Sequence, residues 1–307
     1  TSGGTESDNW AIKGVVEPGG KHLTITSQIE HHAVLNTCGT LERFGYPVIY
    51  LPVNACGTVT PEVLERTITQ QTRLVSVMLV NNEVGTVEPI KELADVAHAH
   101  AALFHTDAVQ AVGHIPIDVN KLGVDMLSAS AHKFNGPKGI GFLYVRKGTS
   151  ISPYVDGGAQ ELGMRGGTEN VASIVGMATA LKKNCDEMQQ TTNRLYILER
   201  NFIDTLCATG VDFIRNGAES RAPGNINISI RGASGEMLLH RLDLKGISIS
   251  TGSACDSVKT QVSHVIKAIG VPQEYAEGTI RVSFGRDNNV EDASEVAKAI
   301  ISVISLK

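Results

Sequence analysis

Short apolar segments alternate with helix-like segments through the first half of this 307-residue chain. Strand-like runs such as Arg73–Val80 and Met126–Ser130 are apolar on both faces, and stretches such as His32–Phe44 and Ile90–His100 have helical spacing. Strands that are apolar on both faces need cover on both sides, which the intervening helices supply in a mainly parallel sheet. The sequence therefore predicts an α/β fold. Further strands are expected at residues 21–26, 47–51 and 102–106, and a further helix at residues 61–68.

The pattern changes in the second half of the chain. Ser173–Ala208 reads as long helices rich in Ala, Leu, Lys and Glu, and Asn225–Ile230 reads as a short strand. Helices are expected at Gly235–Leu242 and Val290–Val303. Such a mixture predicts a smaller α+β domain. We therefore expect a large domain over residues 1–190 and a small C-terminal domain over residues 191–307.

Composition excludes several classes of function. The net charge of −5 gives no electrostatic case for binding nucleic acid or an anionic membrane surface. No apolar run approaches the ~20 residues of a membrane-spanning helix. The cysteines are odd in number, scattered and without zinc-ligand spacing, which predicts no metal site and free thiols in a reducing, cytoplasmic compartment. Cys38 and Cys207 lie in apolar helix-like patterns, so we expect both in the core.

Polar residues follow the predicted strands. Asn81–Glu83, Asp107–Gln110 and Ser130–Lys133 each come directly after a strand-like run. Ligands of parallel α/β sheets bind beyond the carboxyl ends of the strands. These three segments are therefore the candidate ligand-binding residues.

Asp107 and Lys133 point to a specific chemistry. Asp107 ends a buried strand, where a carboxylate is costly unless paired; alternatively it caps a helix over Ala108–Gln110. Lys133 is either a solvated loop residue or a Schiff-base lysine, whose amine has to be largely desolvated to react as a nucleophile. Pyridoxal phosphate (PLP) requires such a pair, a lysine for its aldehyde and a carboxylate for its pyridinium nitrogen.

The motifs around this pair resemble those of the NifS/IscS-type cysteine desulfurases, which belong to the class V aminotransferases within the fold-type I PLP enzymes. Asp107–Gln110, Ser130–Lys133 and Gly136–Gly141 resemble the family's cofactor site. The other matches, in family order, are Thr1–Asn9 as the phosphate loop, Glu30–Leu35, Val80–Gly85, Met164–Asn170 and Thr251–Cys255. One such motif is weak evidence, but the ordered set covers essentially the whole chain. The resemblance implies a mainly parallel sheet of the seven-stranded type.

The resemblance also implies how PLP is held. Lys133 binds it covalently and later moves the substrate's Cα proton, and Asp107 keeps the pyridine nitrogen protonated. His31 stacks on the ring and handles protons on the substrate thiol. The remaining implied contacts are Gly4 and Thr5 through N–H groups at a helix start, Ser130 and His132 at the phosphate, Gln110 and Asn82 at the phenolic oxygen or the substrate, and Thr168 from the partner subunit of a homodimer.

Two residues carry the implied reaction on L-cysteine. Arg281 binds the substrate carboxylate with its planar guanidinium, and the nearby Arg286 is expected to be structural. Cys255 lies in the small, polar segment Ser250–Ser257, which favours an exposed loop and a reactive thiolate. The resemblance implies a cysteine desulfurase that releases L-alanine and keeps the sulfur as a persulfide on Cys255. The stretch before Ser263–Ile266 is similar to the mobile-loop NifS/IscS group more than to the short-loop SufS group.

Alternatives remain open at this point. The sulfur acceptor is either an iron–sulfur scaffold or a tRNA-thiolation protein. Selenocysteine lyase and cysteine sulfinate desulfinase are rival activities. A third rival is a non-catalytic sulfur-relay partner, because the chain begins at the phosphate loop, without the family's preceding segment. Leu162 in place of a usual arginine and Val262 in place of a usual proline depart from the family pattern, which predicts tuning rather than loss of activity.

Overall fold

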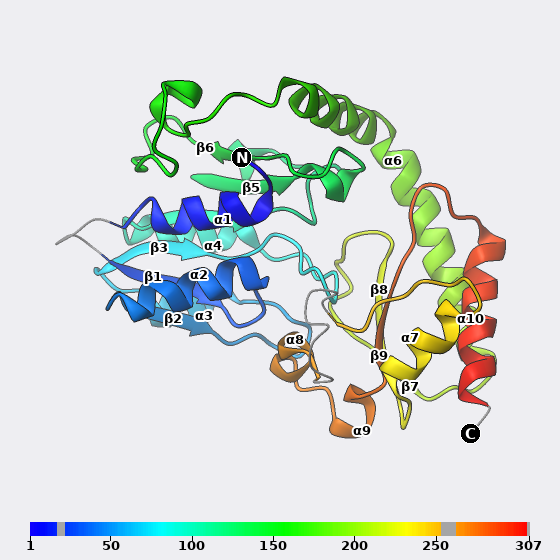
Figure 1. Cartoon of the computed structure of the whole chain (residues 1–307). Helices are drawn as coiled ribbons and strands as arrows, with labels where there is room; N and C mark the ends of the chain where they lie inside the picture. The colour runs from blue at the N-terminus through cyan, green and yellow to red at the C-terminus, as the bar shows by residue number, and fades with distance from the viewer. Residues whose placement is uncertain (17–21, 253–261, 306–307) are drawn as a thin grey trace. The chain divides into compact units, whose positions relative to one another are not determined.

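The computed structural model describes residues 1–16, 22–252 and 262–305, which form two compact units (Figure 1). Unit 1 consists of Thr1–Val53, Val59–Asn81 and Glu88–Asp186. Unit 2 consists of Asn54–Thr58, Asn82–Val87 and Glu187–Lys307. The main boundary between the units, after Asp186, falls inside one helix, and two short segments from the first half of the chain belong to unit 2. A single functional boundary near residue 190 stays a prediction.

Unit 1 is built on a six-stranded sheet of order β2-β1-β3-β4-β5-β6. Neighbouring strands from β2 to β5 are parallel, and β6 pairs antiparallel with β5. The predicted α/β class with a mainly parallel sheet is confirmed; the described part of the chain contributes six strands to it. The bounds are β1 (Leu23–Ser27), β2 (Val48–Leu51), β3 (Thr72–Ser76), β4 (Leu103–Asp107), β5 (Met126–Ser130) and β6 (Gly141–Val145).

Helices of unit 1 bury their apolar stripes against this sheet. Ile12 of α1 and Cys38 of α2 pack in one cluster with Leu74 of β3 and Met126 of β5, so the predicted core position of Cys38 is confirmed. The helices are α1 (Gly4–Lys13), α2 (His32–Arg43), α3 (Pro61–Thr67), α4 (Ile90–Ala99), α5 (Val119–Leu122) and the first part of α6 (Val171–Cys207), with the short 3₁₀ turns η1 (Ala131–Phe134) and η2 (Gln160–Gly163).

Unit 2 contains a three-stranded antiparallel sheet of order β7-β8-β9 covered by helices, which confirms the predicted α+β domain. Its core includes the stripe Leu195, Leu198, Phe202 and Leu206 on the second part of α6. The bounds are β7 (Phe213–Arg215), β8 (Asn225–Ile230), β9 (Thr279–Ser283), α7 (Gly235–Asp243), α8 (His264–Ala268), α9 (Gln273–Ala276) and α10 (Val290–Ile304).

Helix α6 differs from its sequence-based expectation in two ways. The helical stretch expected over Ser173–Ala208 is one helix of 37 residues. Cys207 is exposed, so its predicted core position is wrong. The reason is helical periodicity: Leu206 completes the buried stripe, and the next residue is rotated by about 100° toward solvent. Within the part of the chain that the structure describes, α6 included, no helix is both long and apolar enough to span a bilayer.

Candidate active site

The N-terminus of α1 lies against the carboxyl ends of β4 and β5. A Cβ placed on Gly4 would lie 2.5 Å from Cγ2 of Val109 and 3.6 Å from Cβ of Ser130. Val109 belongs to the turn after β4, and Ser130 is the last residue of β5. Only a glycine lets the start of α1, with its N–H groups and positive dipole end, approach this edge of the sheet. The structure thus brings Gly4 and Ser130 together, as predicted.

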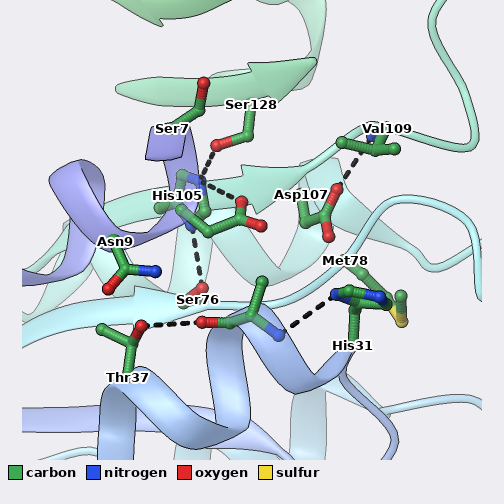
Figure 2. A network of polar contacts seen from close by, with 12 residues as sticks. Ser7, Asn9, His31, Thr37, Ser76, Met78, His105, Asp107, Val109 and Ser128 are labelled. Atoms are coloured by element: carbon green, nitrogen blue, oxygen red, sulfur yellow. Dashed lines mark hydrogen bonds and ion pairs between the residues drawn. The ribbon is translucent and has the colours of Figure 1, made fainter. Parts of the chain in front are cut away.

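Asp107 is the buried last residue of β4, and its Oδ1 accepts the N–H of Val109 at 2.9 Å (Figure 2). The capping alternative is confirmed in part, because Asp107 accepts this N–H at the start of a segment, residues 109–114, that forms turns rather than a regular helix. Burial raises the pKa of Asp107 to about 6, while the Val109 N–H and the Lys133 ammonium act in the opposite direction. Asp107 and Lys133 are therefore near enough to interact electrostatically.

Lys133 lies in η1, directly after β5, with an exposed side chain. The side chain is solvated in the protein alone, and the role of Lys133 as the Schiff-base lysine stays a prediction. In the 3₁₀ turn, Ala131 and Phe134 face the core, which directs Lys133 outward. The turn is held by His114, whose Nε2 lies 2.8 Å from the Lys133 carbonyl oxygen. Desolvation of the amine has to come from whatever binds over it.

His31 is the half-buried N-cap of α2 (Figure 2). Its Nδ1 accepts the N–H of Ala33 at 3.1 Å, so the neutral ring carries its proton on Nε2. The preceding Glu30 is fully buried, and its Oε1 accepts Ser27 Oγ at 2.6 Å and the N–H of Met78 at 3.0 Å. This contact ties the turn that carries His31 to the segment after β3.

The other predicted contacts of unit 1 differ in exposure. Ser130 is buried and Gln110 is half-buried, whereas the other three are exposed. Two causes lower the pKa of His132 and so favour its neutral ring. The larger is loss of water around the ring, although the residue as a whole is exposed, and the smaller is the positive charge of Lys133 and Lys138. The exposed residues are Thr5 in the first turn of α1, His132 in η1 and Thr168 between η2 and α6.

Asn82 and Arg281 meet within unit 2. Arg281 lies on β9, and its Nη1 donates to the backbone oxygen of Asn82 at 2.7 Å. Its backbone forms a bridge with Ser250, with N···O distances of 2.7 and 3.0 Å. The predicted substrate pair is thus in direct contact, although through the Asn82 main chain rather than its amide side chain.

Cys255 lies outside the described residues, which omit 253–261. The residues flanking that segment are described and lie close together. A Cβ on Gly252 would lie 3.3 Å from Cβ of Ser263, and Ser263 Oγ caps α8 by accepting the N–H of Val265 at 3.0 Å. The residues on either side of the predicted sulfur-acceptor segment therefore lie together, and Gly252 follows the Ser250–Arg281 bridge by two residues.

Sequence reasoning assigned no role to a buried group next to Asp107. His105 on β4 lies between Ser76 Oγ, 2.8 Å from Nδ1, and Ser128 Oγ, 2.9 Å from Nε2 (Figure 2). Strand alternation could have identified it, because residues two apart on a strand face the same side. His105 therefore shares a sheet face with Asp107.

The residues of unit 1 fit PLP. A helix start that admits no Cβ at Gly4 suits a phosphate, because its N–H groups can approach the anion closely. A buried carboxylate at Asp107 suits a protonated pyridine nitrogen, and Lys133 supplies an accessible amine.

Comparisons with known proteins agree with this chemistry. The family model for class-V aminotransferases matches residues 1–296. The cysteine desulfurase IscS of Methanosarcina thermophila is 47% identical over 307 residues, which is 99% of this chain and 76% of that protein. A solved structure of a NifS-like protein has a TM-score of 0.93 at 38% identity and covers 100% of this chain and 82% of its own. The structure of SspA in complex with cysteine has a TM-score of 0.80 at 37% identity, and the match covers 93% of this chain and 80% of the SspA chain.

Proposed function

Because the chain belongs to the class-V aminotransferase family and is similar to its cysteine desulfurases along 99% of its length, we propose that it desulfurates L-cysteine. The products are L-alanine and a persulfide on Cys255. The observation that carries the proposal is the group formed by Asp107, Lys133 and the Gly4 end of α1 in unit 1. The Gly4 end of α1 suits the phosphate, Asp107 suits the ring nitrogen, and Lys133 suits the aldehyde.

The cofactor contacts are proposed as follows. PLP, when bound, supplies an electron sink for the bonds of the substrate Cα. The N–H groups of Gly4 and Thr5 bind the phosphate together with Ser130, His132 and the partner's Thr168. Asp107 keeps the ring nitrogen protonated, and its pKa of about 6 leaves it mainly ionised at neutral pH. Gln110 and Asn82 orient the phenolic oxygen or the substrate.

Proton transfer is assigned to Lys133 and His31. Lys133 is exposed on η1, so its amine can reach the substrate Cα once substrate and cofactor cover it. His31 has Nδ1 occupied by the Ala33 N–H, and Nε2 is the atom that exchanges a proton with the substrate thiol. The buried Glu30 before it bonds Ser27 and the Met78 N–H, which supports a fixed orientation of the His31 ring.

Substrate recognition is assigned to Arg281. Its hydrogen bond to the Asn82 carbonyl orients the guanidinium plane, which favours a planar contact with the substrate carboxylate. Arg286, five residues later, is assigned a structural role, because its Nη1 forms an ion pair with Oε2 of Glu187 at 3.6 Å.

The sulfur transfer balances without an external oxidant. The Cys255 thiolate attacks the substrate sulfur, so that an S–S bond forms and the Cβ–S bond breaks. The electron pair of the broken bond stays with Cβ, which takes up a proton and becomes the methyl group of alanine. The closeness of Gly252 to Ser263 supports this assignment, because both flanks of the segment that contains Cys255 lie in unit 2, near the Ser250–Arg281 bridge.

Assembly and partners follow from the same proposal. Val171 and Val175 on α6 are 63% and 59% exposed and follow Thr168 in the chain, which supports a homodimer that covers this part of unit 1. The persulfide then passes to an iron–sulfur scaffold or a tRNA-thiolation protein. A cytoplasmic location is proposed because Cys255 has to remain a free thiol.

The test is incubation of the PLP-loaded protein with L-cysteine, with alanine and sulfide both measured. Lys133→Ala is expected to lose both products and the cofactor absorbance near about 420 nm. Cys255→Ser is expected to lose sulfide release from cysteine. A protein that binds no PLP supports the sulfur-relay alternative. Unchanged release of selenide from selenocysteine, or of sulfite from cysteine sulfinate, in Cys255→Ser supports selenocysteine lyase or cysteine sulfinate desulfinase.

A further inference from the structure

A layer of buried polar side chains lies between the apolar core of unit 1 and the candidate active site. On one face of the sheet, Leu74, Leu103 and Met126 pack against α1 and α2. Two residues further along each strand, the same face carries Ser76 on β3, His105 on β4 and Ser128 on β5. Ser76 pairs with His105 in the strand register, and Ser128 pairs with Asp107.

Helix α1 adds a fourth member to this layer. Oδ1 of Asp8 lies 3.8 Å from Nε2 of His105, and the Asp8 carboxyl also hydrogen-bonds Ser128. Ser76, His105 and Ser128 are fully buried, and Asp8 is 1% exposed. Figure 2 shows His105 between the two serines, with Asp107 beside it. We call these four buried side chains the His105 row. Their polar atoms lie against one another rather than in solvent, and Oδ1 of Asp8 faces His105 without a hydrogen bond.

The His105 row is built from neutral groups. Burial lowers the pKa of His105 to about 3. Burial, and then repulsion from Asp107 and from Glu30, raises the pKa of Asp8. A protonated Asp8 can donate to Ser128, which donates to Nε2 of His105, and the Nδ1–H of His105 then donates to Ser76.

The row connects the two ends of the candidate cofactor site. His105 is two residues before Asp107 on the same strand face, and Asp8 is one helical turn after Gly4. A contact between Asp8 and His105 thus sets how far the start of α1 lies from the Asp107 carboxylate. Both parts are stiff, one a helix and the other the centre of a sheet.

We propose that Asp8 and His105 are positioning residues that hold the phosphate-binding end of α1 in register with Asp107 across the length of PLP. The inference rests on the proposed function, because it needs PLP to occupy this site. It assigns a role to residues that touch neither cofactor nor substrate. Burial and repulsion from Asp107 raise the pKa of Asp8, which favours proton binding at Asp8 and leaves the Asp107 carboxylate for the ring nitrogen.

The test compares PLP affinity among four variants of the full chain. Asp8→Ala and His105→Phe remove the row's central contacts, and Asp8→Asn keeps a neutral donor of the same shape. Thr72→Val is the matched control: Thr72 is fully buried on the same face of β3, at the opposite end, and its Oγ1 accepts the N–H of Thr69 at 3.0 Å. PLP dissociation constants are measured by equilibrium dialysis, and the ³¹P resonance of bound PLP reports the phosphate environment.

Asp8→Ala and His105→Phe are expected to weaken PLP binding by about tenfold or more and to shift the ³¹P resonance. Asp8→Asn is expected to stay within about threefold of the parent protein, because it reproduces a protonated carboxyl. Thr72→Val is expected to lower the melting temperature without moving either PLP readout. Should the two disruptive variants not fold, Ser76→Ala, which removes only the outer acceptor, takes their place.

Wild-type PLP affinity and an unmoved ³¹P signal in the disruptive variants would overturn the proposal and leave the proposed function intact. Loss of PLP binding in Asp8→Asn equal to that in Asp8→Ala would also overturn it, because a charge rather than a neutral contact would then be needed. A parent protein that binds no PLP overturns both proposals together.

Discussion

Gly4→Ala tests whether close approach of α1 to the sheet edge creates the phosphate site. The new Cβ would lie 2.5 Å from Cγ2 of Val109, about 1 Å short of the distance at which carbon atoms attract each other. Val109 is β-branched and has little freedom to rotate away. The start of α1 is therefore expected to move outward by about 1 Å, because the Val109 N–H is tied to the buried Asp107 carboxylate at the end of β4.

The expected cost of this overpacking is about 1–3 kcal/mol in the free energy of unfolding of the apoprotein. PLP affinity should fall by about tenfold or more, because a displaced helix start no longer presents its N–H groups at the phosphate. Urea denaturation measures the first quantity and equilibrium dialysis with PLP the second.

Val109→Ala supplies the matched control, since it removes the Cγ2 atom that the new methyl group would strike. The double variant Gly4→Ala/Val109→Ala is expected to recover most of the PLP affinity, a coupling that a double-mutant cycle detects. If the double variant bound PLP no better than Gly4→Ala alone, the steric reasoning would be refuted.

Three further predictions follow from particular side chains. Asp107 has a pKa raised to about 6, so the native apoprotein holds its proton more tightly than the unfolded chain, and stability falls as pH rises from about 4 to 6. Asp107→Asn should stabilise the apoprotein at pH 7.5 by up to about 3 kcal/mol in urea titrations, give no gain near pH 4, and weaken PLP binding. Arg281→Lys should raise KM for L-cysteine by about tenfold with a smaller change in kcat, because an ammonium lacks the planar fork; an unchanged KM would remove Arg281 from the substrate site. Cys207→Ser should change the free energy of unfolding by less than about 0.5 kcal/mol, whereas Cys38→Ser should cost about 1–3 kcal/mol, and equal effects would contradict their different burial.

Strand prediction succeeded where burial is uniform. The strands expected at Met126–Ser130 and Asn225–Ile230 have those bounds in the structure, because both lie inside a sheet and every side chain of the first is buried. The expected strand Arg73–Val80 is shorter in the structure, Thr72–Ser76. Its last residues are equally apolar and buried, and the N–H groups of Val77 and Leu79 still bond the β4 carbonyls of His105 and Asp107 at 3.1 and 2.9 Å, but the regular strand ends at Ser76.

Side-chain environments were predicted less well. Lys133 is exposed because a 3₁₀ turn, which has no apolar repeat long enough to recognise, follows β5. The contact between Arg281 and the Asn82 carbonyl joins residues 199 positions apart. Neither feature has a local pattern in the chain, since each depends on how distant segments meet.

Local patterns by themselves determined the parallel α/β sheet, the smaller α+β domain and the ordered motifs that indicate PLP chemistry. These patterns suffice because each one occupies a contiguous stretch of chain. A strand buried on both faces is a run of apolar residues, and each motif holds the residue types that the reaction needs. Only the tertiary structure decided which polar side chains become partners. Ser76, His105 and Ser128 come from three strands and Asp8 from a helix far earlier in the chain, and their hydrogen bonds exist only because strand register and the packing of α1 bring them to one buried layer.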